Sequence, residues 1–557
     1  MSVRLAACAT FLALQATLAA TPMPVAAQQV RVPSAESGSG TPGAGPSSES
    51  GRFIFEAAPV AEPSAAAAAV AASGAEPRPA AAPAPAPAPA ARGGAWPPPV
   101  QEPASPDGCS RPLVGKGTTY HVGPGQPHAE LHDVPWLSLG PGDVVNIHHR
   151  PEPYRTKIGL RAQGTADAPV IIHGVTDARC NRPVISGENA TTARDAAATG
   201  FFNKQHSEPH GLIFIYRSRD QAWGARPRHI RIQNLRLTGA HKDHTFIGMD
   251  GQPARYVGGA AAIYAIVVED LAIENCEITR NGNGVFVNSR SDDEASHGVA
   301  IRHSRIWDNG NVGSWLEHNL YVQTARALYE GNHIGQLIPG ARGSSMKDRS
   351  SATVIRHNTI VAAARAIDLV EIEGGVRRVL DDPLYHQAWV YGNLIVNDFR
   401  LPGQGSVKMI HWGGDNDERY FRQGTLHFFH NTVLVTSTQA QVWYVGLFDM
   451  PTGRQTVRLH GNVIANLGSS QLRLGVEAGT VEFAGTNWIT RDWAEAGPGG
   501  LVKVAMRGRL IEGTQPGLEP DGRPRAGSPV LDAAPPLPDL PALTHQPGAP
   551  LARAVAR

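Results

Sequence analysis

The stretch TVIRHNTI (353–360) recurs in outline along the chain, and this recurrence decides the fold. Each copy has a short run rich in β-branched residues, then an Asn, then a second apolar alternation. Alternation of apolar and polar residues with a period of two is typical of β-strands. The other copies are IRIQNLRL (230–237), LAIENCEI (271–278), WVYGNLIV (389–396), LHFFHNTV (426–433) and VRLHGNVI (457–464).

The Asn of this motif predicts a ladder along a stack of coils. Asn487 extends the series and Ser304 fills its one gap, so that successive members lie 25 to 41 residues apart. One coil cannot bury its own apolar face, but stacked coils share a continuous core. We expect equivalent turns of successive coils to be occupied by Asn234, Asn275, Asn332, Asn358, Asn393, Asn431 and Asn462.

The variable period favours a single-stranded right-handed parallel β-helix, an all-β solenoid, over propellers and leucine-rich repeats, whose units are more uniform. An antiparallel sandwich is the main alternative. It would need hairpin turns of two to five residues, which are scarce in this sequence.

Composition divides the 557-residue chain into four segments. Residues 1–27 resemble a cleaved signal peptide, with Arg4 before an apolar stretch and small residues before position 28. The alternative, a membrane anchor, would need a longer apolar stretch. Residues 28–108 and 534–557 are rich in Pro and Ala and predict a disordered linker and tail, leaving 109–533 as the folded domain. We therefore expect a secreted or periplasmic protein that does not insert into a membrane.

The net charge bears on the possible partners of the protein. The net charge of +1 gives no general attraction to nucleic acid, and nucleic acid is not predicted as a partner.

Cys109 and Cys180 could pair in an oxidising compartment, although they and Cys276 could equally be buried thiols. The phrase AGSPVLDAA (526–534) is typical of a segment that closes a β-helix and would cover the last coil.

Five further phrases of the sequence are informative: YHVGPGQPHAELHDVPWLSLGPGDVVNI (120–147), NGNGVFVNS (281–289), EHNLYV (317–322), SSMKDRSSATVIRHNTI (344–360) and AIDLVEIEGG (366–375). They resemble bacterial β-helix proteins of the pectate-lyase-like superfamily, in particular a group named for polysaccharide degradation. The resemblance covers about residues 110–470 and implies a right-handed parallel β-helix that acts on a polysaccharide.

A looser resemblance is to the β-helix lyases of polysaccharide lyase family six. In that family a Lys in a short strand, followed by an Asn-bearing coil, acts as the base, and Lys347 matches this context. The family's catalytic Arg falls about where this chain reads LVEIEGG (369–375), which is a departure. Arg349 or Arg356 could replace it.

Several polar residues lie at similar distances in sequence after their ladder positions. They are therefore predicted to share one face of three successive coils. A lyase must remove a proton from a uronic acid, hold its carboxylate and protonate the leaving oxygen, which Lys, Arg and His can do. The predicted catalytic residues are Lys347, His318, Asp368, Glu371 and Arg349, and the predicted substrate-binding residues are Asn319, Tyr321 and Arg356.

Other interpretations of these residues remain open. Lys347 and Asp368 could form an ion pair that only bridges two coils, and a hydrolase would use two carboxylates such as Asp368 and Glu371. No cofactor is predicted, although residues 292–294 (Asp-Asp-Glu) could hold Ca²⁺. Trp412, Trp443 and Tyr444 could stack on sugars or pack in the core.

The sequence thus predicts a polysaccharide lyase or related depolymerase acting on an anionic polysaccharide. The alternative is a non-catalytic solenoid that binds or organises polysaccharide at the cell surface. Nothing in the sequence indicates the oligomeric state.

Overall fold

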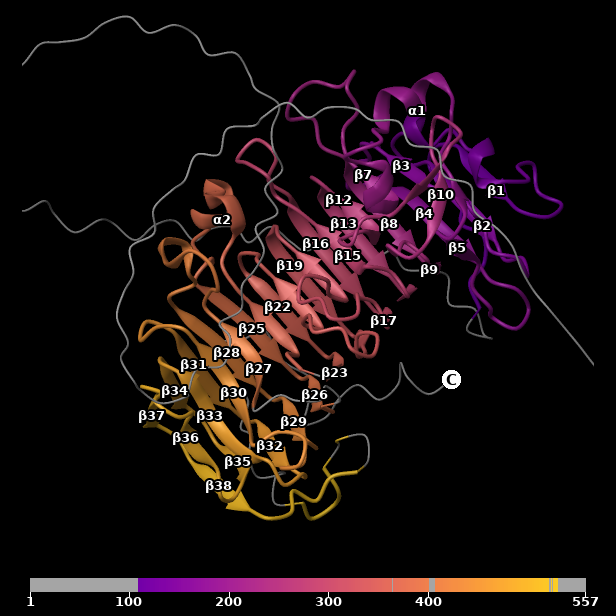
Figure 1. Cartoon of the computed structure of the whole chain (residues 1–557). Coiled ribbons are helices and arrows are strands. Elements are labelled where there is room, and N and C mark those ends of the chain that lie inside the picture. Colours follow the sequence, from indigo (N-terminus) through magenta and orange to yellow (C-terminus); the bar gives the residue numbers. More distant parts are fainter. Residues whose placement is uncertain (1–108, 363, 400–405, 520–521, 523, 529–557) are drawn as a thin grey trace, which may run out of the picture. The chain divides into compact units, whose positions relative to one another are not determined.

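A computed structural model describes residues 109–362, 364–399, 406–519, 522 and 524–528. These residues form a solenoid of three long sheets in which all strands are parallel (Figure 1). The predicted class, a right-handed parallel β-helix, is confirmed. The predicted signal peptide (1–27), linker (28–108) and tail (534–557) lie outside the described residues.

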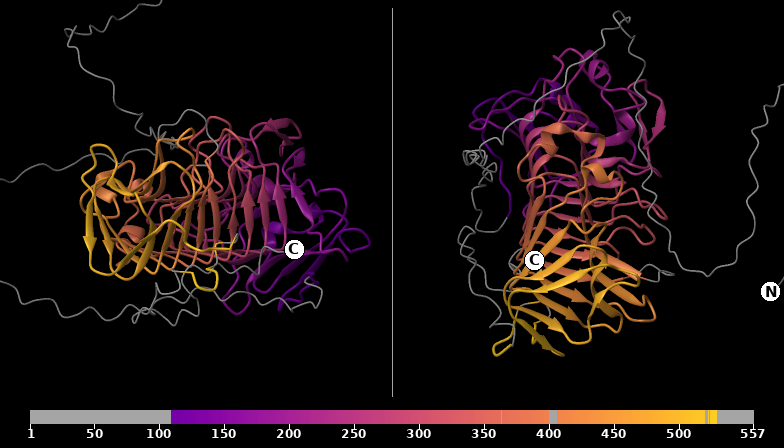
Figure 2. Two further views of the ribbon diagram at one scale, coloured as in Figure 1. Left: turned by 90° about the horizontal axis from the view of Figure 1, so that it is seen from below. Right: turned by 90° about the vertical axis from the view of Figure 1, so that its left-hand side faces the viewer.

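We call the three long sheets A, B and D, and the strands stack along the solenoid (Figure 2). From β3 onward each coil contributes one strand to each of them, in the order D, A, B along the chain, whereas β1 and β2 belong to sheet A alone. Sheet A has 13 strands: β1 (Thr119–Val122), β2 (Val144–His148), β4 (Val170–Val175), β8 (Arg228–Gln233), β13 (Glu269–Glu274), β16 (His297–Arg302), β19 (Ala325–Glu330), β22 (Thr353–Arg356), β25 (Gln387–Tyr391), β28 (Thr425–Phe429), β31 (Thr456–His460), β34 (Thr480–Phe483) and β37 (Lys503–Met506).

Sheets B and D have 11 strands each. Sheet B contains β5 (Val184–Ser186), β9 (Arg236–Thr238), β14 (Glu277–Thr279), β17 (Arg305–Trp307), β20 (His333–Ile334), β23 (Thr359–Ala362), β26 (Leu394–Asn397), β29 (Thr432–Val435), β32 (Val463–Asn466), β35 (Asn487–Thr490) and β38 (Leu510–Gly513). Sheet D contains β3 (Ile158–Leu160), β7 (Gly211–Ile215), β12 (Ala261–Ala265), β15 (Asn283–Val287), β18 (Leu320–Val322), β21 (Met346–Asp348), β24 (Ile367–Leu369), β27 (Ser406–Trp412), β30 (Tyr444–Met450), β33 (Gln471–Glu477) and β36 (Ala494–Ala496).

The remaining elements are short and lie in the connections between the strands of the long sheets. A small sheet C joins β6 (Ala190–Thr191), β10 (Thr245–Ile247) and β11 (Pro253–Arg255). The helices are α1 (Ala196–Phe201), α2 (Arg377–Leu380) and the 3₁₀ turns η1 (Leu131–Asp133), η2 (Trp136–Ser138), η3 (Glu208–His210), η4 (Glu373–Gly375) and η5 (Glu418–Tyr420). None of the described helices is long and apolar enough to cross a membrane.

The core is built from columns of identical or similar apolar residues. Ile232, Ile273 and Ile301 lie in register on three neighbouring strands of sheet A, and all three are fully buried. Burying one such side chain stabilises the fold by about 1.5–3 kcal/mol. Because strand partners fall in register, the same inward position repeats from coil to coil, and the core runs continuously along the stack.

The Asn ladder is present at the turn from sheet A to sheet B. The Nδ2 of Asn332 donates to Oδ1 of Asn358 at 2.9 Å, and Asn358 donates in the same way to Asn393 at 3.0 Å. The ladder continues through Asn431 and Asn462 to Asn487, and the backbone N–H of Ser304 donates to Asn332. The ladder prediction is therefore confirmed from Asn332 to Asn462.

For Asn234 and Asn275 the same prediction is wrong by one residue. Strand pairing places Glu274 beside Arg302, so Cys276, not Asn275, lies at the ladder position beside Ser304. The N–H of Cys276 donates to the Ser304 hydroxyl at 3.1 Å. In the coil before it, the pairing of Gln233 with Glu274 puts Leu235 at that position.

Asn234 and Asn275 instead occupy the position just before the ladder, where φ is positive. Later coils fill that position with His303, Gly331, His357 and Gly392 in turn. Asn and Gly tolerate the left-handed conformation better than other residues, and Gly also leaves room. A β-carbon on Gly392 would lie 2.6 Å from Nδ1 of His357, so bulky and small residues alternate along this column.

The turn from sheet A to sheet B has a constant length. Two residues separate the strands in every coil from β8–β9 to β31–β32, for example His357 and Asn358 between β22 and β23. The variation in coil length falls in the connections on either side of sheet D. These longer connections carry α1, α2 and sheet C.

Both ends of the described chain are fastened to the solenoid. A disulfide joins Cys109 to Cys180, which confirms the first of the two alternatives for these cysteines, and Cys276 is a buried free thiol. Near the other end, Leu518 packs with outward residues of sheet B such as Leu434 and Trp488. The segment up to Ser528 thus covers part of sheet B, and residues 529–534 of the predicted closing phrase lie outside the described residues.

Candidate functional site

The candidate site lies on the outer face of sheet D, in a column of outward-facing residues that pair in strand register. Along this column four rings, those of Phe214, Tyr264, Phe286 and Tyr321, stack at centroid distances of 4.4 to 5.7 Å. Strand register then continues the column as Lys347, Asp368, His411 and Asp449. We call these eight residues the sheet D column. Parallel strands are about 4.8 Å apart, so its charged groups are neighbours.

Lys347 projects outward from β21, between two inward-facing neighbours. Its Nζ lies 2.7 Å from Oδ2 of Asp415 and 3.4 Å from Oδ2 of Asp368. The predicted proximity of Lys347 and Asp368 is therefore observed. The Lys347 side chain is only 9% exposed, because the segment after β27 that carries Asp415 lies against it.

A second set of pairs continues the network toward β30 and β33. Arg365, just before β24, lies 3.1 Å from Asp368 and 2.9 Å from Asp449. His411 contacts the same Oδ1 of Asp368, at 2.9 Å from Nδ1. Lys408 pairs with Asp449 at 3.0 Å. Arg365 and Lys408 are 23% and 30% exposed, so they form the more accessible side of the network.

Arg349 and Glu371 support the loop that follows β27. The Glu371 carboxylate accepts hydrogen bonds from the backbone N–H groups of Asp415, Asn416 and Asp417 at 2.8 to 3.0 Å. Arg349 is 1% exposed and lies 3.2 Å from Asp415. Its Nε donates to the Tyr321 hydroxyl at 2.9 Å. Both residues therefore hold Asp415 in place and have no free surface for a substrate.

His318 joins the network through Ser344. The backbone N–H of Ser344 donates to Nδ1 of His318 at 2.9 Å, and its hydroxyl donates to Oδ2 of Asp368 at 3.1 Å. The His318 ring is buried 5.6 Å from that of Tyr321. The predicted neighbourhood of His318, Lys347 and Asp368 is thus found, with Ser344 as the link.

Burial and charge set the protonation of these groups. Burial acts to raise the pKa of Asp368, but Lys347 and Arg365 outweigh it and hold that pKa well below its usual range. The pKa of Asp415 is lowered in the same way by Arg349 and Lys347. Burial, with a smaller contribution from Lys347, lowers the pKa of His318 to about 3. At neutral pH the site therefore holds two ionised carboxylates and a neutral His318.

Two of the predicted substrate-binding residues lie elsewhere. Asn319 is fully buried, donates to the carbonyl of Gly335 and accepts from Asn309, so it holds loops together. Arg356 belongs to sheet A and pairs with Glu330. Of the eight predicted site residues, those that the structure brings together are Lys347, His318, Asp368, Glu371, Arg349 and Tyr321.

Sequence reasoning missed Arg365, Lys408, His411, Asp415 and Asp449. Lys347 lies 15 residues past Asn332, Asp368 lies 10 past Asn358, and His411 lies 18 past Asn393. Because the connection before sheet D varies in length, a fixed count cannot follow the column. Arg365 had a local signal, since it lies three residues before Asp368 in the phrase next to the predicted site.

Among the described residues, no three His, Cys, Asp or Glu side chains are grouped so that they could hold an ion. In the acidic stretch 292–294, Glu294 faces Arg217 and Arg290, and Asp292 accepts from the backbone of Arg378. The carboxylates that could have bound Ca²⁺ therefore point to different partners.

The three aromatic residues singled out in the sequence have different environments. Trp412 faces the core and is fully buried, so it cannot stack on a sugar. Trp443 is 74% exposed at the start of β30, and the ring of the next residue, Tyr444, is covered by the Arg473 guanidinium at 4.4 Å. Of these three residues, only Trp443 offers a free ring face.

Comparison with known proteins finds only distant similarity. No protein-family model matches the sequence, and no similar sequence is found among curated proteins. Similar solved structures include an alginate lyase from Paenibacillus sp. str. FPU-7 (13% identity, TM-score 0.35, covering 60% of this chain and 91% of that chain). Others are a GH136 lacto-N-biosidase from Eubacterium ramulus (11%, 0.38, 71% and 68%) and PfbA, a surface adhesin of Streptococcus pneumoniae (9%, 0.25, 65% and 83%). Likeness this low carries no argument about activity.

Proposed function

We propose that the protein is an exported enzyme that binds an anionic polysaccharide along the outer face of sheet D and cleaves it by β-elimination. The observation that carries this proposal is the convergence of Lys347, Arg365 and His411 on Asp368, on three successive coils. Lys347, in its neutral amine form, is the proposed base that takes the proton from the uronate ring. Arg365 and Lys408, on the accessible side, are proposed to hold the uronate carboxylate by charge-assisted hydrogen bonds.

The protonation of the carboxylates favours elimination over hydrolysis. A glycoside hydrolase needs one carboxylic acid that keeps its proton in order to donate it to the leaving oxygen. The pKa values of Asp368 and Asp415 are both lowered, and Glu371 is occupied by three backbone N–H groups. The Tyr321 phenol, whose pKa is raised mainly by burial, is protonated at neutral pH and is the proposed proton donor.

A second function, polysaccharide binding without cleavage, is favoured by one observation. Every cation in the network already has a carboxylate partner, and Lys347 lies between two of them. Such pairing is what a purely structural network would show. The two functions differ in whether a product is formed.

The test is an absorbance assay near 235 nm, where unsaturated uronates absorb, with alginate, polygalacturonate, a chondroitin and dermatan sulfate mixture, and neutral dextran. We expect product from at least one anionic polymer and none from dextran. Lys347→Ala should lower the rate by about 10²-fold or more, since positioned proton transfer contributes that much. Arg365→Ala should lower kcat/KM as well.

The matched control is Arg458→Ala, which removes a half-exposed Arg on the outer face of sheet A and should leave the rate unchanged. Wild-type protein that yields no product from any polymer, but is retarded by one of them in affinity electrophoresis, would overturn the enzyme and support the binding protein. Equal melting temperatures of wild type and Lys347→Ala are required for the comparison.

A further inference from the structure

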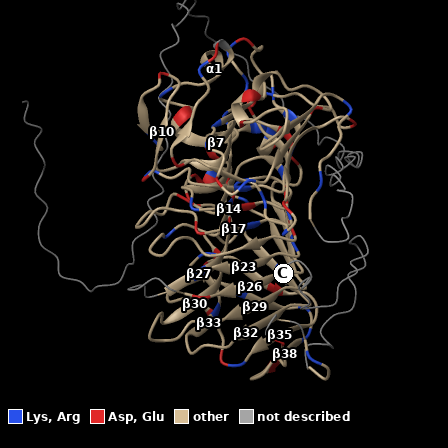
Figure 3. Ribbon diagram, turned by 90° about the vertical axis from the view of Figure 1, so that its right-hand side faces the viewer, with Lys and Arg blue, Asp and Glu red and all other residues tan. Residues whose placement is uncertain are grey.

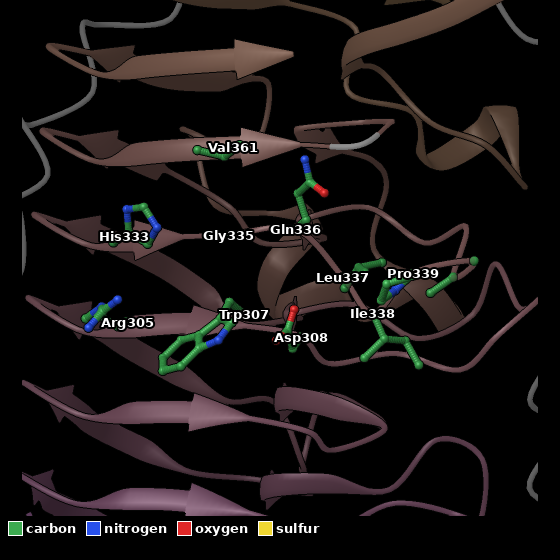
Figure 4. Close-up of a pocket in the computed structure, with 12 residues that line it drawn as sticks. Arg305, Trp307, Asp308, His333, Gly335, Gln336, Leu337, Ile338, Pro339 and Val361 are labelled. Carbon is green, nitrogen blue, oxygen red and sulfur yellow. The ribbon is translucent and has the colours of Figure 1, made fainter. Parts of the chain in front are cut away.

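A concave site lies on the outer face of sheet B, away from the sheet D column. Its volume is about 350 Å³, and β17, β20 and β23 form its floor (Figure 4). Figure 3 looks onto the side of the solenoid that carries these strands. The lining includes Arg305, Trp307, Asp308, His333 and the loop 336–341. Pockets of this size are in the range that holds small ligands.

The hollow exists because one outward position has no side chain. Continuing the register of β17, β20 and β23 puts Gly335 between Trp307 and Val361 in an outward column. A β-carbon on Gly335 would lie 2.7 Å from the β-carbon of Trp307, so only Gly fits beside the indole. The missing side chain leaves space along the ring, and the loop 336–341 closes the other side.

The loop that forms this wall is held firmly. The Nε2 of Gln336 donates to Oδ2 of Asp398 at 3.0 Å, and Leu337 and Ala341 are buried. The carbonyl of Gly335 accepts from Asn319, which explains why that predicted binding residue faces inward. The pocket is therefore shaped before any ligand arrives, which lowers the entropic cost of binding.

The chemistry of the lining matches a sugar ring. The Trp307 indole offers an apolar face, on which the C–H groups of a pyranose can stack. Arg305 is exposed, and its guanidinium lies 5.1 Å from the Trp307 ring centroid, at the rim. Among the described residues, no side chain or backbone group pairs with the Asp308 carboxylate, which Figure 4 shows next to Trp307. A carboxylate accepts the hydrogen bonds that ring hydroxyls donate.

We propose that this pocket is a subsite for one pyranose ring of an acidic glycan. Trp307 stacks on the ring, Asp308 accepts from its hydroxyls, and Arg305 contacts a carboxylate or sulfate group at the pocket mouth. The choice of an acidic glycan rests on the proposed function. Binding in this pocket needs no chemistry at Lys347, so the two proposals can fail separately.

The experiment is isothermal titration of the full-length protein with tetrasaccharides of alginate, polygalacturonate and dermatan sulfate. We expect at least one to bind, and Trp307→Ala to weaken that binding about tenfold, the effect of losing one aromatic stacking contact. Asp308→Asn should weaken it less, and Val361→Phe, which fills the hollow from the next strand, should weaken it at least as much. The matched control is Trp315→Ala, on a neighbouring loop outside the pocket lining, which should bind as wild type does.

Two results would overturn the subsite. One is wild-type protein that binds none of the three tetrasaccharides, and the other is unchanged affinity in Trp307→Ala and Val361→Phe. If affinity depends on Trp307 but no polymer yields product, the subsite stands and the elimination mechanism fails. If cleavage occurs, Trp307→Ala should raise KM and leave kcat nearly unchanged, whereas Lys347→Ala should lower kcat.

Discussion

At the scale of single residues, His318 shows how burial fixes a charge state in the sheet D network. Its pKa is lowered to about 3, whereas a histidine in an unfolded chain has a pKa near 6.5. Between these values the unfolded state binds a proton that the folded state does not bind. The free energy of unfolding therefore falls as the pH drops from about 6.5 toward 3.

Replacing His318 should make the protein less sensitive to acid. We expect His318→Asn to flatten the fall in the free energy of unfolding between pH 6 and pH 4 by up to about 1.4 kcal/mol per pH unit, the value for one proton. His173 and His210, whose pKa values burial lowers to about 4, should keep part of the slope in this variant. Urea denaturation at each pH measures it, and identical slopes for the variant and wild type would contradict the assignment.

Residue identity alone could not reveal which charged groups of this chain are available to a ligand. Arg349 was a candidate for the carboxylate-binding Arg, but five acceptor groups, including the carboxylates of Glu371 and Asp415, surround it. Arg365 is more exposed, but the sequence does not distinguish a solvent-facing Arg from a buried one. Asp348 is likewise not available to a ligand, since it faces the core and pairs with the fully buried Arg422 at 2.8 Å.

At the scale of elements, the Asn ladder links the successive coils from Asn332 to Asn487 by buried hydrogen bonds. Asn393 donates from Nδ2 to the side chain of Asn431 and to the carbonyl groups of Ile355 and Tyr391. Its Oδ1 accepts from the backbone and the side chain of Asn358. Removing the amide leaves several of these buried groups without partners.

Asn393→Ala should therefore lower the free energy of unfolding by about 2–4 kcal/mol, because each unsatisfied buried group costs about 1–3 kcal/mol. Asn393→Ser is the matched variant, since Ser304 shows that a hydroxyl can hold a ladder position, and it should lose about half as much. Chemical denaturation would measure both. A loss below about 0.5 kcal/mol in the Ala variant would mean that the ladder is not a source of stability.

The ladder also shows how far the sequence can predict such an element. Parallel register makes like residues recur, so the motif around Asn358, Asn393 and Asn431 predicted both the sheets and the turn. In the coils of Asn234 and Asn275 the repeated Asn falls at the neighbouring left-handed position, where Asn is also favoured. Two positions of one turn that accept the same residue type cannot be told apart by that residue.

At the scale of the whole molecule, a solenoid is a one-dimensional stack, and its stability depends on what holds its ends. The disulfide from Cys109 to Cys180 fastens the segment before β1 to the connection after β4. Residues near Cys109 also contact the early coils, as where the Ser110 hydroxyl donates to the carbonyl of Gly174. The link closes a loop with a sequence separation of 71 residues.

Loss of this link should destabilise the fold. The chain-entropy relation gives about 4 kcal/mol for a loop of this length. We expect Cys180→Ser to melt at a lower temperature than wild type, and reduction of wild type to reproduce the shift. Cys276→Ser, which alters the buried free thiol, serves as the control and should not respond to reductant differently from wild type. Equal melting of oxidised and reduced wild type would show that the link contributes nothing.

The constant two-residue turn between sheets A and B has a consequence for how such a chain can change over evolutionary time. Because the strand register is set at that edge, an insertion or deletion in a connection beside sheet D leaves the register of every other coil unchanged. Loops around sheet D can then change in length and sequence, or be exchanged between relatives, while the turn between sheets A and B maintains the strand register. Recombination at the two-residue turn would join coils of different origin without changing their strand register. This edge is therefore the natural boundary for building chimeras.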